Sequence, residues 1–483
     1  MKKPTQILHI SAECYPAAKT GGLADVVGAL PKYLNEAQVR AQVIIPKYDL
    51  LWINEQNWQE VYTGSVWMGY YDQPFRILSI SQEVLGFELL SVELLGKFDR
   101  PGIYADPHGH PYGDDVDRFV SFQKAVLKWV QQLEKVPDIL HCHDHHTGFI
   151  PFFTKHCPEY QSLSKIPTVF TIHNGKYHGD FGWDLRYMLP HFDNWVGGLI
   201  EWQGRINPLA AGIKSCWKLT TVSNTYLEEL RTDSGGLEWL FREEAHKSMG
   251  ILNGIDTVVW DPSTDPSLSF TLKKSVSNFK RENKKPIIAE YGLDPALPLI
   301  SFIGRFAIEK GADVLPDLVY QTFDNNFPVN LFILGSGDPT ITGALNGMQP
   351  RYAGKFNTFI GYNEDLAHQI YAGSDFLFMP SRVEPCGLNQ MYALRYGTIP
   401  IVRRTGGLQD SVVDIGDEGG SGIMFNHVLT GDILHAFYRA TVLFGDKKKF
   451  KQVQGNNMQL DFSWQKSASI YVSIYKELQK KIA

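Results

Sequence analysis

The sequence has few cysteines and no pattern that would pair them. The five are odd in number, widely spaced and without a C-x-x-C pair, so neither a disulfide framework nor a zinc ribbon is indicated. Runs of 18 apolar residues are also missing, and the apolar stretch Ile7–Ile10 is too short for the core of a signal peptide. We therefore expect a cytoplasmic protein with reduced thiols and no membrane segment.

An excess of positive charge is missing too. The 46 Lys and Arg residues are outnumbered by 52 Asp and Glu residues, so the formal net charge is -6. Nucleic-acid binders are usually basic, which argues against that class. The 483 residues do have an ordinary hydrophobic fraction of 43% and a high aromatic content of 13%. The length allows two or three domains, and flat aromatic faces with polar edges suit sugar rings.

Residues 1–252 alternate short apolar runs with helical patterns, which is typical of a parallel sheet covered by helices. The expected strands are Ile7–Ile10, Gln42–Pro46, Phe75–Ile80, Phe87–Leu94, Ile139–His143, Thr168–His173 and Leu219–Val222. Ligands of such sheets collect beyond the carboxyl ends of the strands. The candidate ligand contacts are therefore Lys19–Gly22, His143–His146, His173–Gly175 and Ser223.

The segment 253–298 is polar, proline-rich and charged, which indicates a junction and linker. A second alternating pattern spans 299–461, and the amphipathic pattern of 462–483 predicts a C-terminal helix. We therefore predict an α/β fold with two Rossmann-like domains facing a central cleft. The strands expected in the second domain are Leu299–Ile303, Asn330–Leu334, Thr358–Ile360, Phe376–Met379 and Ile399–Val402.

Two glycine turns in the second domain have the pattern of a phosphate site. Glu384, Cys386 and Gly387 lie at one strand-to-helix turn, and the next strand leads to a second turn at Thr405, Gly406 and Gly407. Helix N-termini preceded by glycine bind phosphate through backbone N–H groups. The N-terminal segment KTGGLAD repeats the RTGGLQD of the second turn, which we interpret as an internal repeat. Two unrelated helix starts are the alternative.

Arg305 and Lys310 follow the first strand of the second domain, in GRFAIEKG. A guanidinium fork and an ammonium beyond a strand end can neutralise a diphosphate and stabilise the charge of a leaving group. A solvated helix start is the alternative.

Three other clusters have competing interpretations. His141, His143 and His145 share one face of an extended segment, a spacing that metal sites use; we favour a buried strand, because no second ligand cluster accompanies them. The DDVD of residues 114–117 has the Asp-x-Asp spacing of metal-dependent sugar-nucleotide enzymes, but it precedes a helix, where acidic residues cap the N-terminus. Cys386 has no neighbouring histidine to form a thiolate, so we expect it to line the site.

Six segments together resemble the bacterial glycogen synthase and plant starch synthase family: KTGGLADV, TIHN, GRFAIEKG, LGSGDP, EPCGL and RRTGGLQDSV. The resemblance covers about Ile7 to Tyr475. It implies a GT-B fold with the C-terminal helix crossing back to the first domain. It also implies a retaining glucosyltransferase that moves glucose from ADP-glucose to the non-reducing end of an α-1,4-glucan, such as glycogen or a maltooligosaccharide, without a metal or other cofactor.

The resemblance also implies residue roles. His173 matches the family's catalytic-site histidine, Glu384 its active-site carboxylate, and Arg305 with Lys310 its diphosphate clamp. The implied substrate contacts are Lys19, Gly21, Gly22 and Asp25 at the sugar-phosphate region, Asp114 near the acceptor, Asn253 in the cleft, Tyr362 on the adenine, Cys386, Gly387 and Leu388 at the glucose, and Thr405, Gly406 and Gly407 at a second phosphate turn.

Four positions depart from the family pattern. Asp115 stands in place of Asn, His145 in place of Trp, Asn389 in place of Thr and Ala210 in place of Lys. They affect the acceptor contacts and the wall of the cleft, so the preferred length of the acceptor glucan is left open. The sequence also leaves open the choice among ADP-, UDP- and GDP-glucose and the oligomeric state. A GT-B sugar-nucleotide epimerase or hydrolase and a non-catalytic glucan-binding protein are the alternative functions.

Overall fold

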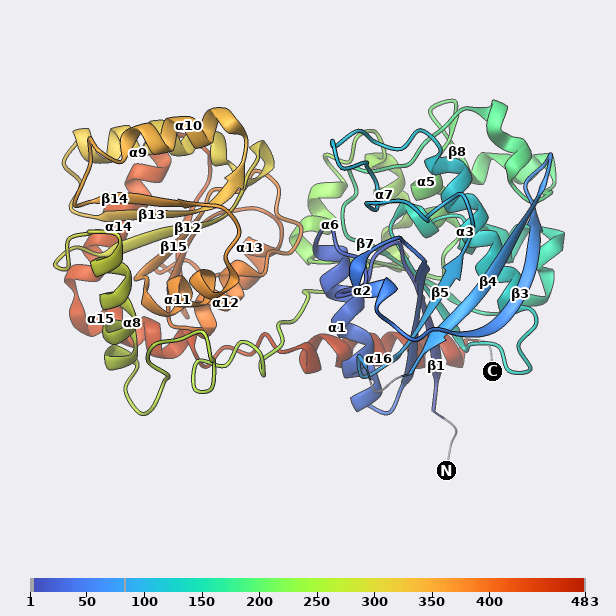
Figure 1. The fold of residues 1–483 in the computed structure, drawn as a ribbon, viewed down its shortest axis with the longest axis horizontal. Helices are drawn as coiled ribbons and strands as arrows, with labels where there is room; N and C mark the ends of the chain where they lie inside the picture. Colours follow the sequence, from blue (N-terminus) through green and yellow to red (C-terminus); the bar gives the residue numbers. More distant parts are fainter. Residues whose placement is uncertain (1–3, 82–83, 482–483) are drawn as a thin grey trace. The chain divides into compact units, whose positions relative to one another are not determined.

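The computed structural model describes residues 4–81 and 84–481. The chain forms two compact units, each an α/β layer structure with its own sheet (Figure 1). Unit 1 consists of Met1–Val222, Leu227–Ile251 and Trp464–Ala483, and unit 2 of Ser223–Tyr226 and Leu252–Ser463. The α/β class with two Rossmann-like domains is confirmed. Residues 1–3 and 482–483, at the ends of the predicted first domain and C-terminal helix, lie outside the described part.

Unit 1 is built on a nine-stranded sheet in the order β11-β10-β7-β6-β1-β2-β5-β4-β3. The strands from β11 to β5 run parallel, and all seven predicted strands are present. The strands are β1 (Gln6–Ile10), β2 (Arg40–Pro46), β3 (Gln59–Trp67), β4 (Asp72–Ile80), β5 (Glu88–Glu93), β6 (Ile139–His143), β7 (Thr168–Ile172), β10 (Lys218–Thr221) and β11 (Ser248–Gly250), with a separate pair β8 (Glu201–Trp202) and β9 (Arg205–Ile206).

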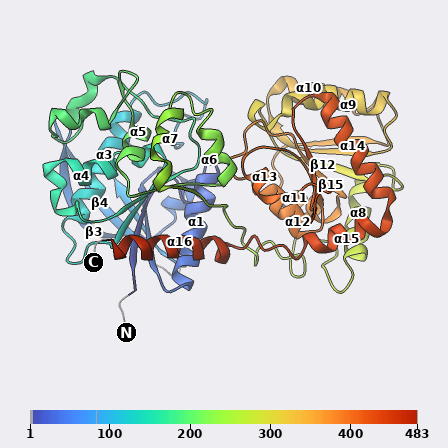
Figure 2. The same ribbon diagram turned by 180° about the vertical axis from the view of Figure 1, so that it is seen from behind.

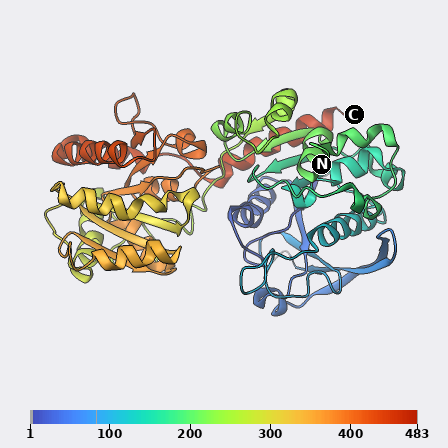
Figure 3. The same cartoon turned by 90° about the horizontal axis from the view of Figure 1, so that it is seen from above.

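The edge of this sheet differs from the prediction. β3 and β4 form an antiparallel hairpin, visible in blue at one side of unit 1 in Figure 3, and β4 also pairs antiparallel with β5. β3 was not predicted because most of its side chains are exposed, so it lacks the apolar run of a buried strand.

Helices cover both faces of the unit 1 sheet. They are α1 (Gly22–Glu36), α2 (Leu51–Asn54), α3 (Asp115–Val130), α4 (Ile150–His156), α5 (Pro208–Ser215), α7 (Glu238–Glu243) and α16 (Trp464–Lys480), with the 3₁₀ segments η1 (His145–Thr147), η2 (Pro158–Leu163), η3 (Trp183–Met188), η4 (Asn194–Leu199) and η5 (Glu244–Lys247). Helix α6 (Asn224–Leu230) contains residues of both units.

The C-terminal helix α16 belongs to unit 1, as predicted. Figure 2 shows it in red beside α1. Its apolar face, with Trp464, Tyr471 and Tyr475 buried, packs into the core formed by α1, β1 and β6. The hydroxyl of Tyr475 also lies 2.7 Å from Nδ1 of His141 on β6. Helix α16 therefore completes the core that α1, β1 and β6 form.

Unit 2 has a six-stranded parallel sheet in the order β14-β13-β12-β15-β16-β17. One core lies under α9, α10 and α14 on one face, and two more lie under α8, α11 and α12 on the other (Figure 1). The strands are β12 (Leu299–Phe306), β13 (Asn330–Gly337), β14 (Phe356–Ile360), β15 (Phe376–Met379), β16 (Ile399–Arg403) and β17 (Ile423–Phe425). The helices are α8 (Val276–Glu290), α9 (Leu315–Asp324), α10 (Pro339–Met348), α11 (Glu364–Gly373), α12 (Asn389–Arg395), α13 (Gly406–Ser411), α14 (Thr430–Gly445) and α15 (Lys447–Asn457), with η6 (Ile308–Lys310) and η7 (Ala312–Val314).

The segment 253–298 is more than the junction and linker that its composition predicted. It contains α8, and its residues Phe279, Ile287 and Ile288 are buried in the cores of unit 2. Phe279 and Ile288 lie on opposite sides of the helix, so the three do not form one apolar stripe. Lysines, asparagines and other polar residues separate Phe279 from the two isoleucines, and no apolar run stands out in the sequence. The polar composition of this segment therefore gave no indication of α8, which packs against α11.

Within residues 4–81 and 84–481, no helix is long and apolar enough to cross a membrane.

We expect α16 to be required for the stability of unit 1. Trp464 is 4% exposed and stacks on Tyr33 of α1 at a centroid distance of 6.5 Å. Replacing Trp464 by alanine should lower the free energy of unfolding of unit 1 by about 3–5 kcal/mol, because it leaves a large cavity. Urea unfolding followed by circular dichroism measures the change. The matched control is Trp195→Ala, in which the lost side chain is 81% exposed; an equal loss in both variants would contradict the expectation.

Candidate active site

Glu384 is the carboxylate around which the unit 2 candidates gather. It lies between β15 and α12, and its side chain is 8% exposed. Nζ of Lys310, in η6 after β12, donates to both carboxylate oxygens over 2.8 and 2.7 Å. The hydroxyl of Ser381 donates to Oε2 over 2.9 Å. Because β12 and β15 are neighbours in a parallel sheet, their carboxyl ends bring these two loops together.

Arg305, at the end of β12, lies on the surface of unit 2. Its side chain is 73% exposed, and Nη2 donates to Glu309 over 2.8 Å. Exposed ion pairs of this kind add little to stability, so the guanidinium can exchange Glu309 for another anion at small cost. Each cation of the predicted clamp thus has its own carboxylate in this structure, and their joint action on a diphosphate stays a prediction.

The two glycine turns of unit 2 lie backbone against backbone. The amide of Gly407 donates to the carbonyls of Glu384 and Pro385 over 3.0 and 3.2 Å. A Cβ at Gly407 would lie 2.0 Å from the carbonyl oxygen of Cys386, and one at Gly406 would lie 2.1 Å from that of Glu384. Glycine is therefore required at both positions by close approach, and Gly406 also has φ of 41°.

This packing corrects one part of the phosphate-turn prediction. The Gly407 amide was expected to point at a ligand, but it is used within the protein, because α13 begins directly against the preceding turn. Gln390 reinforces the contact: its Nε2 donates to the carbonyls of Cys386 and Gly387 and to Ser411 Oγ, over 3.0–3.1 Å. The first function of the paired glycines is to join the turns.

Cys386 has the properties of a lining residue, not of a nucleophile. Burial raises the pKa of its thiol to about 12, although a hydrogen bond from the backbone of Asn253 acts in the opposite direction. Since the thiolate is the reactive form, this cysteine is unreactive at neutral pH. The contact also places Asn253 beside the glycine turn; its role as a site residue stays a prediction.

Three other predicted contacts occupy the ends of elements in unit 2. Tyr362 follows β14, is 85% exposed and donates its hydroxyl to Glu364 over 3.1 Å. Leu388 and Thr405 are the N-cap residues of α12 and α13, and Thr405 is buried. The ring of Tyr362 is thus available to stack on a planar group.

In unit 1 the predicted glycine loop is held by an internal carboxylate. Oε2 of Glu13 accepts hydrogen bonds from the amides of Thr20 and Gly21, over 2.6 and 3.0 Å. The structure therefore gives the Gly21 amide a protein partner where the sequence indicated a phosphate. Lys19 donates to Asp25 over 2.6 Å, and α1 begins at Gly22, so an ion pair joins the glycine loop to the first turn of α1.

His173 follows β7 and is held at its backbone by Asp144, which follows β6. The His173 amide donates to Oδ1 of Asp144 over 2.6 Å. Asp144 has φ of 56° and ψ of 178°, a conformation that is almost confined to glycine and costs a non-glycine residue about 1–3 kcal/mol. Burial raises the pKa of its carboxyl group to about 7. Strain and burial together mark Asp144 as a positioning residue for His173.

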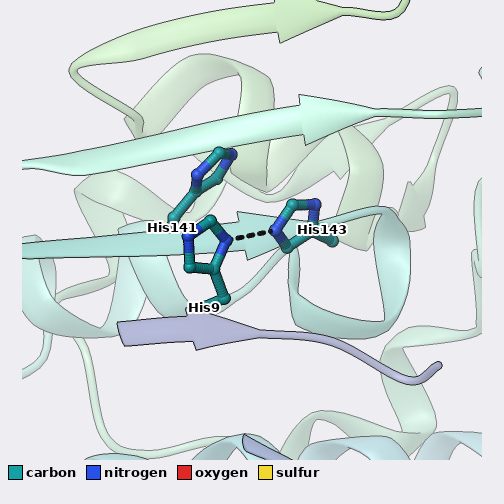
Figure 4. Close-up of side chains that lie close together, drawn as sticks. All are labelled: His9, His141 and His143. Atoms are coloured by element: carbon teal, nitrogen blue, oxygen red, sulfur yellow. Dashed lines mark hydrogen bonds between the residues drawn. The ribbon is translucent and has the colours of Figure 1, made fainter. Parts of the chain in front are cut away.

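The histidine-rich strand β6 is buried, as favoured from the sequence, and it meets a histidine of β1. His9, His141 and His143 have ring nitrogens within 4.8 Å of one another (Figure 4). The nitrogens of His141 contact Tyr475 and Thr171, and those of His143 contact His9 and His173. A metal ion bound by all three rings would therefore have to displace existing hydrogen bonds.

The DDVD segment lies at the start of α3 and makes ion pairs. Asp114 is the N-cap residue, but it makes no side-chain capping bond; instead it pairs with Arg100 over 2.5 Å. Asp115 pairs with the buried Arg118 over 2.7 Å, and Asp117 pairs with Lys97. The capping bond inferred for this segment is thus replaced by ion pairs.

Sequence reasoning did not identify Glu13 and Gln390 as parts of the candidate site, and it included Asp144 only as a member of the range His143–His146. Glu13 and Asp144 do lie just beyond the ends of β1 and β6, where the rule for parallel sheets places ligand contacts. Their orientation toward backbone amides, however, depends on loop geometry that no residue pattern encodes.

Comparison with known proteins adds the following findings. Residues 6–243 match a family described as the starch synthase catalytic domain, and residues 297–440 match the family glycosyl transferases group 1. A glycogen synthase of Flavobacterium johnsoniae is 48% identical over 474 residues, covering 97% of this chain and 98% of its own. A glycogen synthase of Bacillus anthracis is 37% identical over 486 residues, covering 98% and 100%.

Two solved structures are also similar to this chain. The catalytic domain of starch synthase IV from Arabidopsis thaliana, bound to ADP and acarbose, is similar with a TM-score of 0.85 at 31% identity, covering 99% of this chain and 100% of its own. A sucrose-phosphate synthase from Thermosynechococcus elongatus shares the fold, with a TM-score of 0.61 at 16% identity, covering 98% and 99%.

We expect the stability of unit 1 to fall in mild acid. Burial holds the pKa values of six histidines below the usual value near 6.5, so they stay neutral in the folded protein while the unfolded chain takes up protons. Stability should therefore be full above pH 6.5 and be lost as the pH falls below it, by up to about 1.4 kcal/mol per pH unit for each histidine. The six are His9, His141, His143, His145, His146 and His173.

Urea unfolding between pH 7.5 and 4.5 measures this slope. The raised pKa of Asp144 has the opposite effect on the pH dependence of stability, because the folded protein then holds one proton that the unfolded chain has lost. It offsets the effect of at most one histidine. His9→Phe should reduce the number of protons taken up on unfolding by about one, and with it the slope of the free energy of unfolding against pH. His108→Gln, a change at an exposed histidine, should leave that slope unchanged. A stability maximum near pH 5 would contradict the expectation.

Proposed function

The chain belongs to the glycogen and starch synthase family, and from this premise we propose how it transfers glucose from ADP-glucose to the non-reducing end of an α-1,4-glucan. Its relatives support a nucleotide-sugar donor and a glucan acceptor. The ADP bound to the Arabidopsis enzyme favours adenine as the base of the donor. The observation on which the proposal for this chain depends is the buried Glu384, joined to Lys310 beside the glycine turns.

Lys310 and Arg305 stabilise the leaving diphosphate in this proposal. When the bond between C1 of glucose and the phosphate oxygen breaks, the electron pair stays on ADP, and negative charge grows there. Preorganised cations stabilise such charge without reorganisation during the reaction. Lys310 is already fixed by Glu384, and Arg305 has only an exposed partner to give up.

The glucosyl unit then gains positive charge, and Glu384 faces that charge as a carboxylate. The 4-hydroxyl of the acceptor forms the new bond to C1 from the side that ADP leaves, and its proton passes to the diphosphate. A double displacement through Glu384 is the competing route. Both oxygens of Glu384 accept hydrogen bonds from Lys310, and Oε2 accepts a further one from Ser381; this weakens the carboxylate as a nucleophile and favours the same-side route.

His173 contacts the glucose that is transferred, as the family resemblance implies. Asp144 fixes its backbone amide, so the position of this residue does not depend on the substrate. Burial lowers the pKa of the His173 ring to about 3. At neutral pH it is therefore an uncharged hydrogen-bonding group and not a general acid in the imidazolium form.

The remaining contacts are proposed on the same basis. Tyr362 stacks on the base, and Asn253, Cys386, Gly387 and Leu388 contact the sugar. Thr405, Gly406 and Gly407 shape the phosphate turn. Lys19, Gly22 and Asp25 act at the sugar phosphate, Gly21 shapes that loop through its bond to Glu13, and Asp114 acts on the acceptor side. We further propose a cytoplasmic location, which five buried free cysteines support.

One assay tests the reaction. ADP release from ADP-glucose, and UDP release from UDP-glucose, are measured with and without glycogen or a maltooligosaccharide. The proposal expects release that depends on added glucan and is faster with ADP-glucose. Release without glucan would indicate a hydrolase, loss of ADP-glucose without nucleotide release would indicate an epimerase, and no turnover with either donor would indicate a glucan-binding protein.

Lys310→Ala should lower kcat by about 10² to 10³, because it removes one charged contact of the transition state. Lys274→Ala is the control, since Lys274 is an exposed lysine of the same unit, and it should keep the wild-type rate. If Lys310→Ala raised KM and left kcat unchanged, Lys310 would be a simple binding residue and not a part of the transition-state clamp.

A further inference from the structure

Three imidazole rings form a hydrogen-bonded chain that ends at His173. Nδ1 of His9 lies 3.1 Å from Nε2 of His143, and Nδ1 of His143 lies 3.0 Å from Nε2 of His173. The residues come from β1, β6 and the end of β7, which are neighbours in the sheet, and Figure 4 shows the bond between the first two rings. The chain therefore connects the core of unit 1 to the proposed active-site histidine.

All three rings are uncharged at neutral pH. Burial lowers the pKa of His9 and of His173 to about 3, and that of His143 well below its usual value. A neutral imidazole has one N–H donor and one acceptor nitrogen. His143 therefore donates one of its two bonds and accepts the other, so both bonds of the chain must run in the same direction.

The direction of the two hydrogen bonds follows from the ring of His9, at the end of the row of imidazoles opposite His173. Nε2 of His9 is buried and has no hydrogen-bond partner among the described residues. If the chain ran from His173 to His9, this nitrogen would carry a buried, unpaired N–H. In the opposite direction it carries only an unused lone pair, and orphaned N–H donors are the rarer defect in folded proteins. His9 therefore donates to His143, and His143 donates to His173.

We infer that His143, supported by His9, is a positioning residue that fixes the orientation and the tautomer of the His173 ring, with the proton of His173 on Nδ1. The Nε2 of His173 is then occupied as an acceptor. The ring can offer a ligand only its Nδ1–H, so it acts as a neutral donor to a sugar hydroxyl and not as a general base. The role of this tautomer in catalysis rests on the proposed function, whereas the tautomer itself follows from the hydrogen bonds of the three rings alone.

Nuclear magnetic resonance tests the tautomer directly. In the full chain labelled with ¹⁵N-histidine, long-range ¹H–¹⁵N correlation spectra distinguish Nδ1–H from Nε2–H, and loss of signals in His173→Asn assigns the ring. The expected result at pH 7 is a neutral His173 protonated on Nδ1. Free neutral histidine favours Nε2–H, so the expected pattern would not arise by default. A His173 protonated on Nε2, or on both nitrogens, overturns the inference.

Variants of His143 test its role. His143→Leu removes the donor, so His173 should lose the pure Nδ1–H pattern and kcat should fall about tenfold, a typical effect of losing a partner that orients a functional histidine. His143→Asn places an amide N–H near the former Nδ1 and should restore most of both. The matched control is His141→Asn. His141 is on the same strand and equally buried but is not one of the three hydrogen-bonded rings, so this change should leave the His173 tautomer unchanged.

The remaining outcomes are also decisive. An unchanged tautomer in His143→Leu overturns the inference; if that variant does not fold, the wild-type spectrum decides alone. Zn²⁺ added to the wild-type protein should not shift the signals of His9, His141 and His143, and a stoichiometric shift would show a metal site in place of the chain. Lack of transfer from ADP-glucose with an Nδ1–H spectrum would refute the proposed function only.

Discussion

The contact of Glu384 with its surroundings is the constraint on which the unit 2 site depends. Its side chain binds Lys310 and Ser381, and its backbone carbonyl accepts the amide of Gly407. One residue thus connects the loop after β12, the turn after β15 and the turn after β16. Because the contacts involve both the side chain and the backbone, a shift of the Glu384 backbone would disturb the glycine turn and the carboxylate together, so the fold of this sheet edge sets the position of the residue.

Unit 1 uses the same physical device in another form. Glu13 accepts the amides of the glycine loop, and Asp144 accepts the amide of His173. In unit 1 these acidic side chains, just beyond strand ends, satisfy backbone N–H groups that would otherwise be unpaired. In unit 2 the backbone carbonyl of Glu384 does this for Gly407, while its side chain binds Lys310 and Ser381. Loops held by such bonds are positioned before any substrate arrives, which is the condition for efficient electrostatic catalysis.

The sequence predicted most of the fold because buried parallel strands are continuous apolar runs. β6 and β15 were predicted with their observed bounds. The exposed edge strand β3 and the lysine-rich helix α8 escaped, since neither has an apolar segment that stands out from its surroundings. For the candidate site, the residue types at strand ends were informative: Glu384, Lys310 and His173 all lie there.

What the sequence could not provide is the pairing of these groups. The contact of Lys310 with Glu384 joins residues 74 positions apart, and the imidazole chain joins His9 to His143 across 134. Such contacts follow from strand order, which residue patterns specify only loosely. The Gly407 amide shows the same limit: the pattern of a phosphate turn was present, but the neighbouring turn takes the donor.

The backbone of Asp144 has a consequence for how this position can vary. Its φ of 56° with ψ of 178° suits glycine, yet glycine would lose the oxygen that holds the neighbouring strand end. An alanine would keep the unfavourable dihedral angles and lose the oxygen as well, and a glutamate would carry its oxygen one methylene further away. Asparagine alone keeps an acceptor of the same reach, and at the same unfavourable dihedral angles, so the hydrogen bond to the His173 amide restricts this position to aspartate and asparagine.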